Sequence, residues 1–430
     1  PTASLPPRPA LLPLSARSRE ALTALAQAYA ERLAGAGRAQ LDALCWAAAT
    51  RRAALPQRAV FIADDAESLR AQLLAFAAGE AAPAEGTVHA APAQAPVFVV
   101  PGQGGQWVGM ARGLMAREPV FRAALEACDE AARPWLAASL VEQLQLDAGH
   151  PDHRMDRIEL IQPALVALAI AGARWLESLG IEASALVGHS MGEVGAAHLA
   201  GVLDLDQAMR IICRRSALMG GARGGAMAMV DLAMTEAQRC LAGREALLSV
   251  AVSNSPRSCV VSGDRAALND WMAELERDGV FCRLVKVDVA SHSPQMEGPA
   301  AALVAELADL APSAANRPLH STVLARSVDG AELDAAYWGC NLRQPVRFAD
   351  TAAALIDSGA SSFVELGPHP VLAPALQQTA QALAREVATL VLGRRGEPEQ
   401  HNALAVVAGL WAAGHAIDWT RVLPAADTPV

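Results

Sequence analysis

The sequence predicts an α/β protein with a large domain, a smaller domain inserted into it, and an α/β domain ahead of both. Three observations predict this class. An apolar strand leads through a sharp turn into a helix at 183–203. A β-α-β-β-α-β pattern occupies residues 225–289. A stretch rich in Ala, Pro and Gly at 81–96 separates the first residues from the rest and predicts a linker.

Composition limits the possible functions. The chain has 430 residues, of which 53% are hydrophobic and 19% charged, so it is long enough for several domains with a large core. Its formal net charge of -10 argues against a nucleic-acid partner. Seven scattered cysteines without a C-x-x-C pair favour a reducing cytoplasm and disfavour a zinc site. No uncharged apolar run reaches the ~18 residues of a membrane span, and we expect a soluble, cytoplasmic protein.

Residues 1–95 are predicted to form the first domain. The proline-rich start up to Pro13 is expected to be extended. Helical periodicity spans 15–33, with Ser18 as the N-cap. A helix at 40–50, a strand at 59–63 and a helix at 68–79 follow.

A second core begins with the strand 97–101, directly followed by the Gly-rich loop 102–107. This loop lacks the Lys-Ser/Thr of a P-loop and the spacing of a dinucleotide fingerprint. Phosphate binding is therefore the weaker interpretation. The stronger one is a loop whose backbone amides face a nucleophile. A long apolar helix is predicted over 164–179, after the segment 157–163.

The turn Gly188-His-Ser-Met-Gly192 lies between an apolar strand and a helix. Strand, Gly-x-Ser-x-Gly and helix in this order are typical of the nucleophile elbow of α/β-hydrolase-like domains. An accidental match in a Gly- and Ala-rich chain is the alternative, and the flanking elements disfavour it. The elbow predicts Ser190 as a covalent nucleophile. The backbone amides of Gln103 and Met191 are the expected oxyanion-hole donors.

Residues 225–289 read as strand 225–231, helix 234–242, strand 247–253, strand 258–262, helix 264–278 and strand 281–288. This order is the ferredoxin-like arrangement. Asn254 ends one of these strands. A turn-capping role is the stronger interpretation, and a contact with the cleft is the weaker one. The chain then returns to the large domain through a helix at 299–310, a helix at 349–358 and a strand at 362–366. A further helix follows residue 370, and a tail begins near residue 396.

Ser190 needs a proton acceptor, and the chain has ten histidines. His189 lies on the elbow itself, so its side chain is expected to point away and shape the pocket. His292 follows the last strand of the inserted domain, at the kind of junction where sites form, and is the preferred base. His369, in a Gly-Pro-His-Pro turn, is the alternative. No acidic residue stands out as a third member, so a Ser–His dyad held by a backbone carbonyl is possible.

The predicted helix 205–219 carries Arg214 and Arg215 among apolar residues. One arginine is expected to face solvent and the other to point inward. A buried guanidinium needs an anionic partner. An internal salt bridge and a bound anion are both open at this point.

Taken together, several motifs resemble the acyltransferase domain of modular type I polyketide synthases, which is related to the malonyl-CoA:acyl carrier protein transacylases. They are Gly102-Gln-Gly-Gly-Gln-Trp107, Gly188-His-Ser-Met-Gly-Glu193, Arg214-Arg-Ser216, Ala290-Ser-His-Ser-Pro294, Tyr337-Trp338, Asn341-Leu-Arg343, Pro345-Val-Arg-Phe348 and Glu365-Leu-Gly-Pro-His-Pro370. The resemblance assigns 96–224 and 290–395 to the large subdomain and 225–289 to the small one. It makes 1–95 the linker from a ketosynthase and 396–430 the linker after the acyltransferase.

The resemblance also implies roles. Ser190 would be acylated, with His292 as general base and then acid. Arg215 would bind the free carboxylate of a malonyl-type group, and main-chain carbonyls in 341–348 would hold the histidine. The remaining expected substrate contacts are His189, Gln162, Asn254, Val289 and Ser291. No bound cofactor or metal is implied. Acyl-CoA is the donor, the phosphopantetheine of an acyl carrier protein is the acceptor, and a ketosynthase is the covalent neighbour in the parent synthase. Neither a nucleic acid nor a membrane is an expected partner.

The extender unit is predicted from the residues before the base. Methylmalonyl members of the family commonly carry Tyr-Ala-Ser-His and malonyl members His-Ala-Phe-His, whereas this chain reads Val289-Ala-Ser-His292. Ser291 leaves room for an α-substituent, and Arg157–Gln162 resembles the methylmalonyl-type signature. The prediction is therefore methylmalonyl-CoA. Malonyl is an alternative, and Val289 in place of Tyr leaves ethylmalonyl or a larger unit open. A serine hydrolase or thioesterase and a non-catalytic docking module are more remote alternatives.

Overall fold

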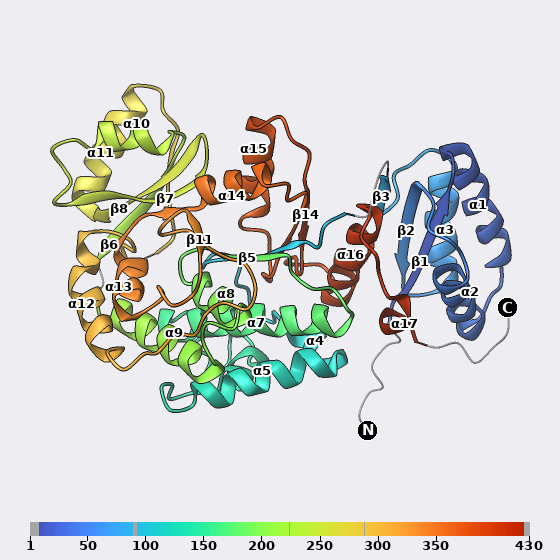
Figure 1. The fold of residues 1–430 in the computed structure, drawn as a ribbon, viewed down its shortest axis with the longest axis horizontal. Coiled ribbons are helices and arrows are strands. Elements are labelled where there is room, and N and C mark those ends of the chain that lie inside the picture. Colours follow the sequence, from blue (N-terminus) through green and yellow to red (C-terminus); the bar gives the residue numbers. More distant parts are fainter. Residues whose placement is uncertain (1–7, 89–92, 223, 288, 425–430) are drawn as a thin grey trace.

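The computed structural model describes residues 8–88, 93–222, 224–287 and 289–424, and Figure 1 shows three sheets with their helices. The first sheet is antiparallel in the order β1-β2-β3, with strands β1 Ala10–Ala16, β2 Gln57–Ala63 and β3 Ala84–Thr87. Its helices are α1 Arg19–Arg32, α2 Arg38–Thr50 and α3 Ala66–Ala77. The predicted N-cap is confirmed, because the Ser18 side chain accepts from the Ala21 amide at 3.2 Å.

Two expectations for this first unit need correction. Residues 10–13 are not merely extended but belong to β1, which pairs with β2 along its whole length. The expected linker 81–96 contains β3, while residues 89–92 lie outside the described part. Both strands lack the signals used to find them. The residues of β1 are almost all buried, so the strand shows no polar alternation, and β3 is a short edge strand of mostly small, polar residues.

The central sheet has the order β11-β10-β5-β4-β13-β14, and all neighbours are parallel except β10 and the edge strand β11. Its strands are β4 Val97–Val100, β5 Ala185–Gly188, β10 Leu319–Ser321, β11 Arg326–Val328, β13 Ser362–Glu365 and β14 Ala388–Val391. Because β4 and β5 are adjacent and parallel, the Gly-rich loop and the elbow leave the same edge of the sheet.

Alternate residues of these strands enter two different cores. Phe98 and Val100 pack on the side of α7, whereas Val97 and Val99 pack against α14, α15 and the small sheet. The strands are therefore buried on both faces, as expected for a parallel sheet. The helices of this unit are α4 Arg112–Arg117, α5 Pro119–Ala132, α6 Leu140–Gln145, α7 Ile158–Ser178, α8 Gly192–Leu199, α9 Leu205–Gly220, α12 Glu297–Glu306, α13 Ala335–Arg343, α14 Phe348–Asp357 and α15 Ala373–Ala382. A short 3₁₀ turn, Pro294–Met296, precedes α12.

Helix α7 begins at Ile158, so the predicted start at residue 164 is wrong. Pro163 lies inside the helix, and a proline there removes the amide that would bind the Glu159 carbonyl. The Ser216 hydroxyl of α9 lies 3.5 Å from that carbonyl and donates to it. The sequence predicted that Pro163 would precede the helix. The structure accommodates it inside α7, because α9 supplies a donor for the free carbonyl.

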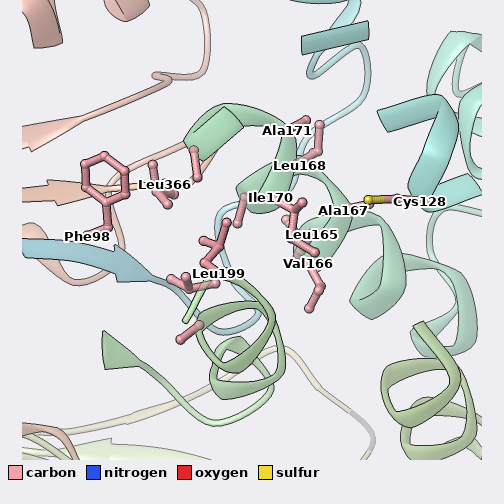
Figure 2. Close-up of a cluster of buried hydrophobic side chains, with 14 of the residues drawn as sticks. Phe98, Cys128, Leu165, Val166, Ala167, Leu168, Ile170, Ala171, Leu199 and Leu366 are labelled. Carbon is pink, nitrogen blue, oxygen red and sulfur yellow. The ribbon is translucent and has the colours of Figure 1, made fainter. Parts of the chain in front are cut away.

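The same helix runs through the centre of the main core (Figure 2). Around it lie buried side chains from the sheet and from other helices, including Phe98, Cys128, Leu199 and Leu366. Within the described part of the chain it alone is long and apolar enough to cross a membrane, but 83% of its most apolar window is buried. A helix that is apolar on all sides and covered on all sides is a core helix.

The inserted unit forms the third sheet, in the order β12-β7-β8-β6-β9. Its elements are β6 Gly225–Val230, α10 Met234–Cys240, β7 Leu248–Ser255, β8 Ser258–Asp264, α11 Arg265–Arg277 and β9 Cys282–Leu284. The predicted ferredoxin-like order is confirmed, although β9 is shorter than the expected 281–288, of which residue 288 is not described. The large unit adds β12, Val346–Arg347, parallel to β7, which ties the two units together.

The C-terminal residues are more ordered than the expected tail. Helix α16, Glu399–Ala412, packs against β14 of the central sheet and against β2 and β3 of the first sheet. Figure 1 shows it between the two bodies, with the short helix α17, Trp419–Val422, beside α2. Residues at the end of the chain therefore join the first unit to the large one.

Candidate active site

The elbow holds Ser190 in a left-handed backbone conformation, with φ of 54°. The turn is tight because β5 ends at Gly188 and α8 begins at Gly192. A Cβ on Gly192 would lie 2.2 Å from the Val100 carbonyl oxygen, and one on Gly188 would lie 2.2 Å from the Glu193 amide nitrogen. Backbone atoms cannot move aside as side chains do, so both positions require glycine.

Ser190 and His292 meet although they lie far apart in the chain. The Ser190 Oγ is 2.7 Å from His292 Nε2, and His292 Nδ1 is 2.8 Å from the Gln344 carbonyl oxygen. A carbonyl can only accept, so Nδ1 carries the proton and Nε2 is free to accept from the serine. This is a Ser–His dyad with a main-chain carbonyl in the third place.

The small unit holds the segment that carries His292. Ser249 of β7 donates to the His292 carbonyl at 2.6 Å, and Ser262 of β8 donates to the Ser291 carbonyl at 2.5 Å. Neither serine was among the predicted site residues. In the sequence they look like ordinary polar residues of two strands. Only the folded sheet brings both hydroxyls to the segment that carries His292.

Burial, together with the nearby Arg215 and His189, lowers the pKa of His292 to about 3. The imidazole is only 2% exposed. A neutral imidazole at physiological pH is the form that can accept a proton from a hydroxyl.

Arg215 points into the site, whereas its neighbour points out. Arg215 is 1% exposed, and its Nη2 donates to Ser190 Oγ at 3.1 Å while Nη1 donates to Gln162 Oε1 at 2.9 Å. Burial lowers the pKa of Arg215 to about 10, which leaves it charged at neutral pH. Arg214 instead forms an ion pair with Glu306 at 2.6 Å. The pair of arginines therefore divides as the sequence suggested.

Gln162 connects Arg215 to the Gly-rich loop. It lies within α7, and its Nε2 donates to Gln103 Oε1 at 3.3 Å. The Met219 sulfur lies 3.2 Å from Arg215 Nη1 and also faces Gln162. Helices α7 and α9 thus fix the guanidinium from two sides.

The two predicted oxyanion-hole donors follow two adjacent parallel strands. Gln103 lies in the loop after β4, and Met191 lies in the turn after β5. In the described residues neither amide donates to another protein atom. Gln103 is exposed, whereas Met191 is buried at the start of α8. Met191 directly follows Ser190, and Gln103 follows the strand beside β5, so these two amides are the candidate donors of an oxyanion hole.

His189 turns away from the Ser190 hydroxyl. Its Nε2 is 3.0 Å from Asn254 Oδ1, and burial lowers its pKa to about 4. Asn254 lies within β7 and contacts the elbow, so the turn-capping role that the sequence favoured is wrong. His369, the alternative base, accepts from the Arg395 amide at 3.2 Å in a different loop.

A buried polar network beneath the elbow was not predicted. The Glu193 carboxylate accepts from the Thr322 amide, from the Thr322 hydroxyl at 2.6 Å and from the Tyr337 hydroxyl. Asn341 Nδ2 bridges this carboxylate and the Ser190 carbonyl, at 3.1 Å to each. Burial raises the pKa of Glu193. The network holds the elbow backbone through the carbonyl of Ser190.

A cavity of about 790 Å³ opens between the large and small units, next to the segment that leads to His292. Gln103, Val289 and Ser291 line it, together with basic side chains that include Arg157 and Lys286. The described residues contain no group of three His, Cys, Asp or Glu side chains that could hold a metal ion. The site thus offers an acyl-sized cavity, a nucleophile, a base and a buried cation.

Comparison with known proteins identifies the family. The acyl transferase domain family matches residues 97–416, and the CurL-like PKS C-terminal family matches residues 10–73. The chain resembles the crystal structure of the acyltransferase domain from module 8 of the salinomycin polyketide synthase, with a TM-score of 0.91 and 37% identity over 96% of this chain and 98% of that one. It also resembles the malonyl CoA-acyl carrier protein transacylase of Coxiella burnetii, with a TM-score of 0.66, 26% identity, and 75% and 99% of the two chains covered.

Among curated proteins, the spectinabilin polyketide synthase system protein NorA' of Streptomyces orinoci is 40% identical over 411 residues, which is 95% of this chain and 11% of that protein. Erythronolide synthase EryA2 of Saccharopolyspora erythraea is 38% identical over 97% of this chain and 12% of its own length. The fold and these matches define an acyltransferase. The chain belongs to the acyl transferase domain family, in the branch found in modular polyketide synthases. It spans about a tenth of the length of these two relatives.

Proposed function

We propose that this acyltransferase loads methylmalonyl from methylmalonyl-CoA onto Ser190 and passes it to the phosphopantetheine thiol of an acyl carrier protein in polyketide biosynthesis. One observation carries the choice of a malonyl-type acyl group. The Arg215 guanidinium is buried beside Ser190 Oγ, and no ion pair joins it to a protein carboxylate among the described residues. A buried, uncompensated cation at the nucleophile favours a substrate that brings its own anion.

Among the residues that the structure describes, the carboxylate whose charge acts on Arg215 is that of Glu193. Its oxygens are already occupied by Thr322, Tyr337 and Asn341. The Nε of Arg215 has no hydrogen-bond partner within the described part of the chain, so a donor remains for a bound anion. A planar guanidinium can hold a carboxylate through two charge-assisted hydrogen bonds, which would fix the thioester relative to the serine.

In the first half-reaction, Ser190 Oγ would attack the thioester carbonyl carbon while its proton passes to His292 Nε2. The Gln103 and Met191 amides would hold the negative oxygen of the tetrahedral intermediate. The C–S bond would then break, and His292 would give the proton to the leaving thiolate of coenzyme A. The bound carboxylate also offsets the Arg215 charge, so the pKa of His292 would rise when substrate binds.

The second half-reaction reverses these roles with a new thiol. The phosphopantetheine thiol would give its proton to His292 and attack the acyl-serine ester. Collapse of the second tetrahedral intermediate would break the C–Oγ bond, and His292 would return the proton to Ser190. The dyad thus acts as base and acid in turn, with no proton gained or lost overall.

The wall of the cavity supports the proposed extender unit. Ser291 and Val289 line the cavity beside His292, and neither fills it as a phenylalanine or tyrosine would. The space left is consistent with the methyl branch of methylmalonyl, with malonyl and ethylmalonyl as the alternatives. Discrimination of one methylene is worth only ~1–3 kcal/mol, so the three units compete at moderate ratios.

Partners are proposed from the relatives. Curated relatives of this chain are named as polyketide synthase proteins and are several times longer. We infer a ketosynthase as covalent neighbour, an acyl carrier protein as acceptor and a cytoplasmic location. No cofactor is proposed beyond the acyl-CoA substrate and the partner's phosphopantetheine.

A competition experiment tests this proposal. Equimolar malonyl-, methylmalonyl- and ethylmalonyl-CoA are mixed with the protein, and intact-protein mass spectrometry quantifies each acyl-enzyme. We expect methylmalonyl to dominate and the Ser190→Ala variant to stay unlabelled. Dominant malonyl loading would overturn the extender assignment, and labelling of Ser190→Ala would overturn the nucleophile.

A further inference from the structure

The loop that supplies the Gln103 amide is held at its middle and at its far end by residues that follow β14. We call residues 102–111 the oxyanion loop, and Arg395 with Glu399 the C-terminal clamp. We propose that the clamp positions the oxyanion loop, so that the chain after β14 is a working part of the active site and not only a linker. This inference rests on the proposed function, because it assigns positioning residues to the same acylation.

Glu399 binds the far end of the loop. Its carboxylate accepts from the amide of Ala111, from that of Gly113 at 2.6 Å and from that of Leu114 at 3.3 Å. These amides belong to the start of α4, whose N-cap Ala111 provides no side-chain cap. A carboxylate from another part of the chain therefore takes the place of the missing capping side chain.

The loop end is strained, which explains why it needs a clamp. Ala111 has φ of 71°, a left-handed conformation that costs a non-glycine residue free energy. Three backbone amides donate to one carboxylate, and these hydrogen bonds stabilise the strained conformation. Burial raises the pKa of Glu399, whereas the three amide hydrogen bonds and the charge of Arg112 lower it.

Gly113 is matched to the carboxylate. A Cβ at this position would lie 2.9 Å from Glu399 Oε2 and 3.4 Å from Glu399 Cβ. Gly113 has no positive φ, so its backbone conformation allows other residues. A side chain at this position is disfavoured because it would collide with Glu399. The substitution Gly113→Ala is therefore a second, independent way to displace the carboxylate.

Arg395 holds the near side of the loop. Its Nη2 donates to the Gln106 carbonyl at 2.9 Å, and the Gln106 side chain in turn accepts from the Gly104 amide at 2.8 Å. Trp107 Nε1 donates to the Pro368 carbonyl at 2.9 Å. Gln103 lies directly before these anchored residues. Its own amide is left free for the oxyanion while the residues after it are fixed.

The consequence is kinetic. An oxyanion hole works because its donors are already aimed at the position where charge develops. A misplacement of 1 Å can cost about a hundredfold in rate. Loss of the clamp should therefore slow acylation without weakening acyl-CoA binding, since the clamp contacts neither Arg215 nor the cavity wall.

The test compares Glu399→Gln with Glu397→Gln, which changes an exposed glutamate on the same segment that pairs with Arg394. Rapid-quench acylation of each full chain by methylmalonyl-CoA gives the rate constant, the half-saturating concentration and the final acyl stoichiometry. We expect Glu399→Gln to lower the rate constant about 10- to 100-fold. The half-saturating concentration and stoichiometry should stay at wild-type values. Glu397→Gln should match wild type in all three.

A lower stoichiometry with an unchanged rate constant would overturn the proposal, because it would mean that Glu399 only stabilises the fold. The double variant Glu399→Gln with Gly113→Ala supplies the second test. Because both changes break one contact, their effects on the rate constant should be far from multiplicative. Fully multiplicative effects would refute a shared positioning role. If wild type itself is not acylated by any malonyl-type CoA, the proposed function fails and not the clamp.

Discussion

Replacing Arg215 with alanine tests the role of the buried guanidinium most directly. Methylmalonyl-CoA and propionyl-CoA differ only in the free carboxylate, so the ratio of their kcat/KM values isolates the carboxylate's contribution. Removing one partner of a buried charge pair costs ~3–5 kcal/mol. Arg215 Nη2 also donates to Ser190 Oγ at 3.1 Å, and loss of that bond, worth ~1–1.5 kcal/mol, affects both substrates.

The difference leaves ~2–4 kcal/mol specific to the carboxylate. At about 1.4 kcal/mol per factor of ten, Arg215→Ala should lower the methylmalonyl-to-propionyl ratio about 30- to 1,000-fold. Time-resolved mass spectrometry of the acyl-enzyme measures both rates on one preparation. The ratio does not depend on the fraction of folded protein, so partial destabilisation cannot imitate the effect.

The neighbouring arginine supplies a matched control. Arg214 carries the same charge on the same helix but pairs with Glu306 at the surface. Exposed pairs of this kind are worth ~0–1 kcal/mol, so Arg214→Ala should leave the ratio nearly unchanged. An Arg215→Ala ratio equal to that of Arg214→Ala would show that the guanidinium does not read the carboxylate, and the choice of a malonyl-type substrate would be wrong.

Three further predictions follow. Ser291→Phe should shift the loading competition towards malonyl by roughly 10-fold, because the aromatic ring fills the wall next to the α-carbon; an unchanged product ratio would remove Ser291 from that wall. The folded-state pKa of His292, about 3, lies far below the ordinary imidazole value of ~6.5, so kcat/KM should not fall with an imidazole-like pKa as the pH drops from ~8 to ~6. A loss of half the activity near pH ~6.5 would contradict a buried neutral base. Gly192→Ala should lower the free energy of unfolding by ~2 kcal/mol or more in urea titrations, since its Cβ would meet the Val100 carbonyl oxygen at 2.2 Å, whereas Gly298→Ala, which meets nothing within 4 Å, should be neutral or slightly stabilising.

The lowered pKa of His292 also makes the free energy of unfolding depend on pH. A histidine whose folded pKa is depressed binds fewer protons folded than unfolded between the two values. Its contribution to stability is therefore complete above pH ~6.5 and is lost as the pH falls towards the folded pKa. His189, with a pKa of about 4, acts in the same direction, so acid should destabilise this active site before it protonates the native base.

Local patterns were enough wherever a short segment dictates its own conformation. The Gly-x-Ser-x-Gly turn, the Ser18 cap and the β-α-β-β-α-β order were read directly from glycine spacing, capping chemistry and apolar periodicity. The same patterns failed at β1, at β3 and at the start of α7. In each case a distant part of the chain stabilises the element. The strands β1 and β3 pair with β2, and the Ser216 hydroxyl binds the carbonyl that Pro163 leaves without an amide donor.

The sequence by itself determined the alternation of strands and helices, the Gly-x-Ser-x-Gly turn that carries Ser190 and the presence of an arginine with an apolar neighbourhood. Tertiary structure alone decided which groups meet. Gln344 offers only a carbonyl that every residue has, and Ser249, Asn341 and Glu399 become functional through contacts 43, 151 and 288 residues away in the chain. Hydrogen bonds of this kind depend on position and direction in space, and a one-dimensional pattern records neither.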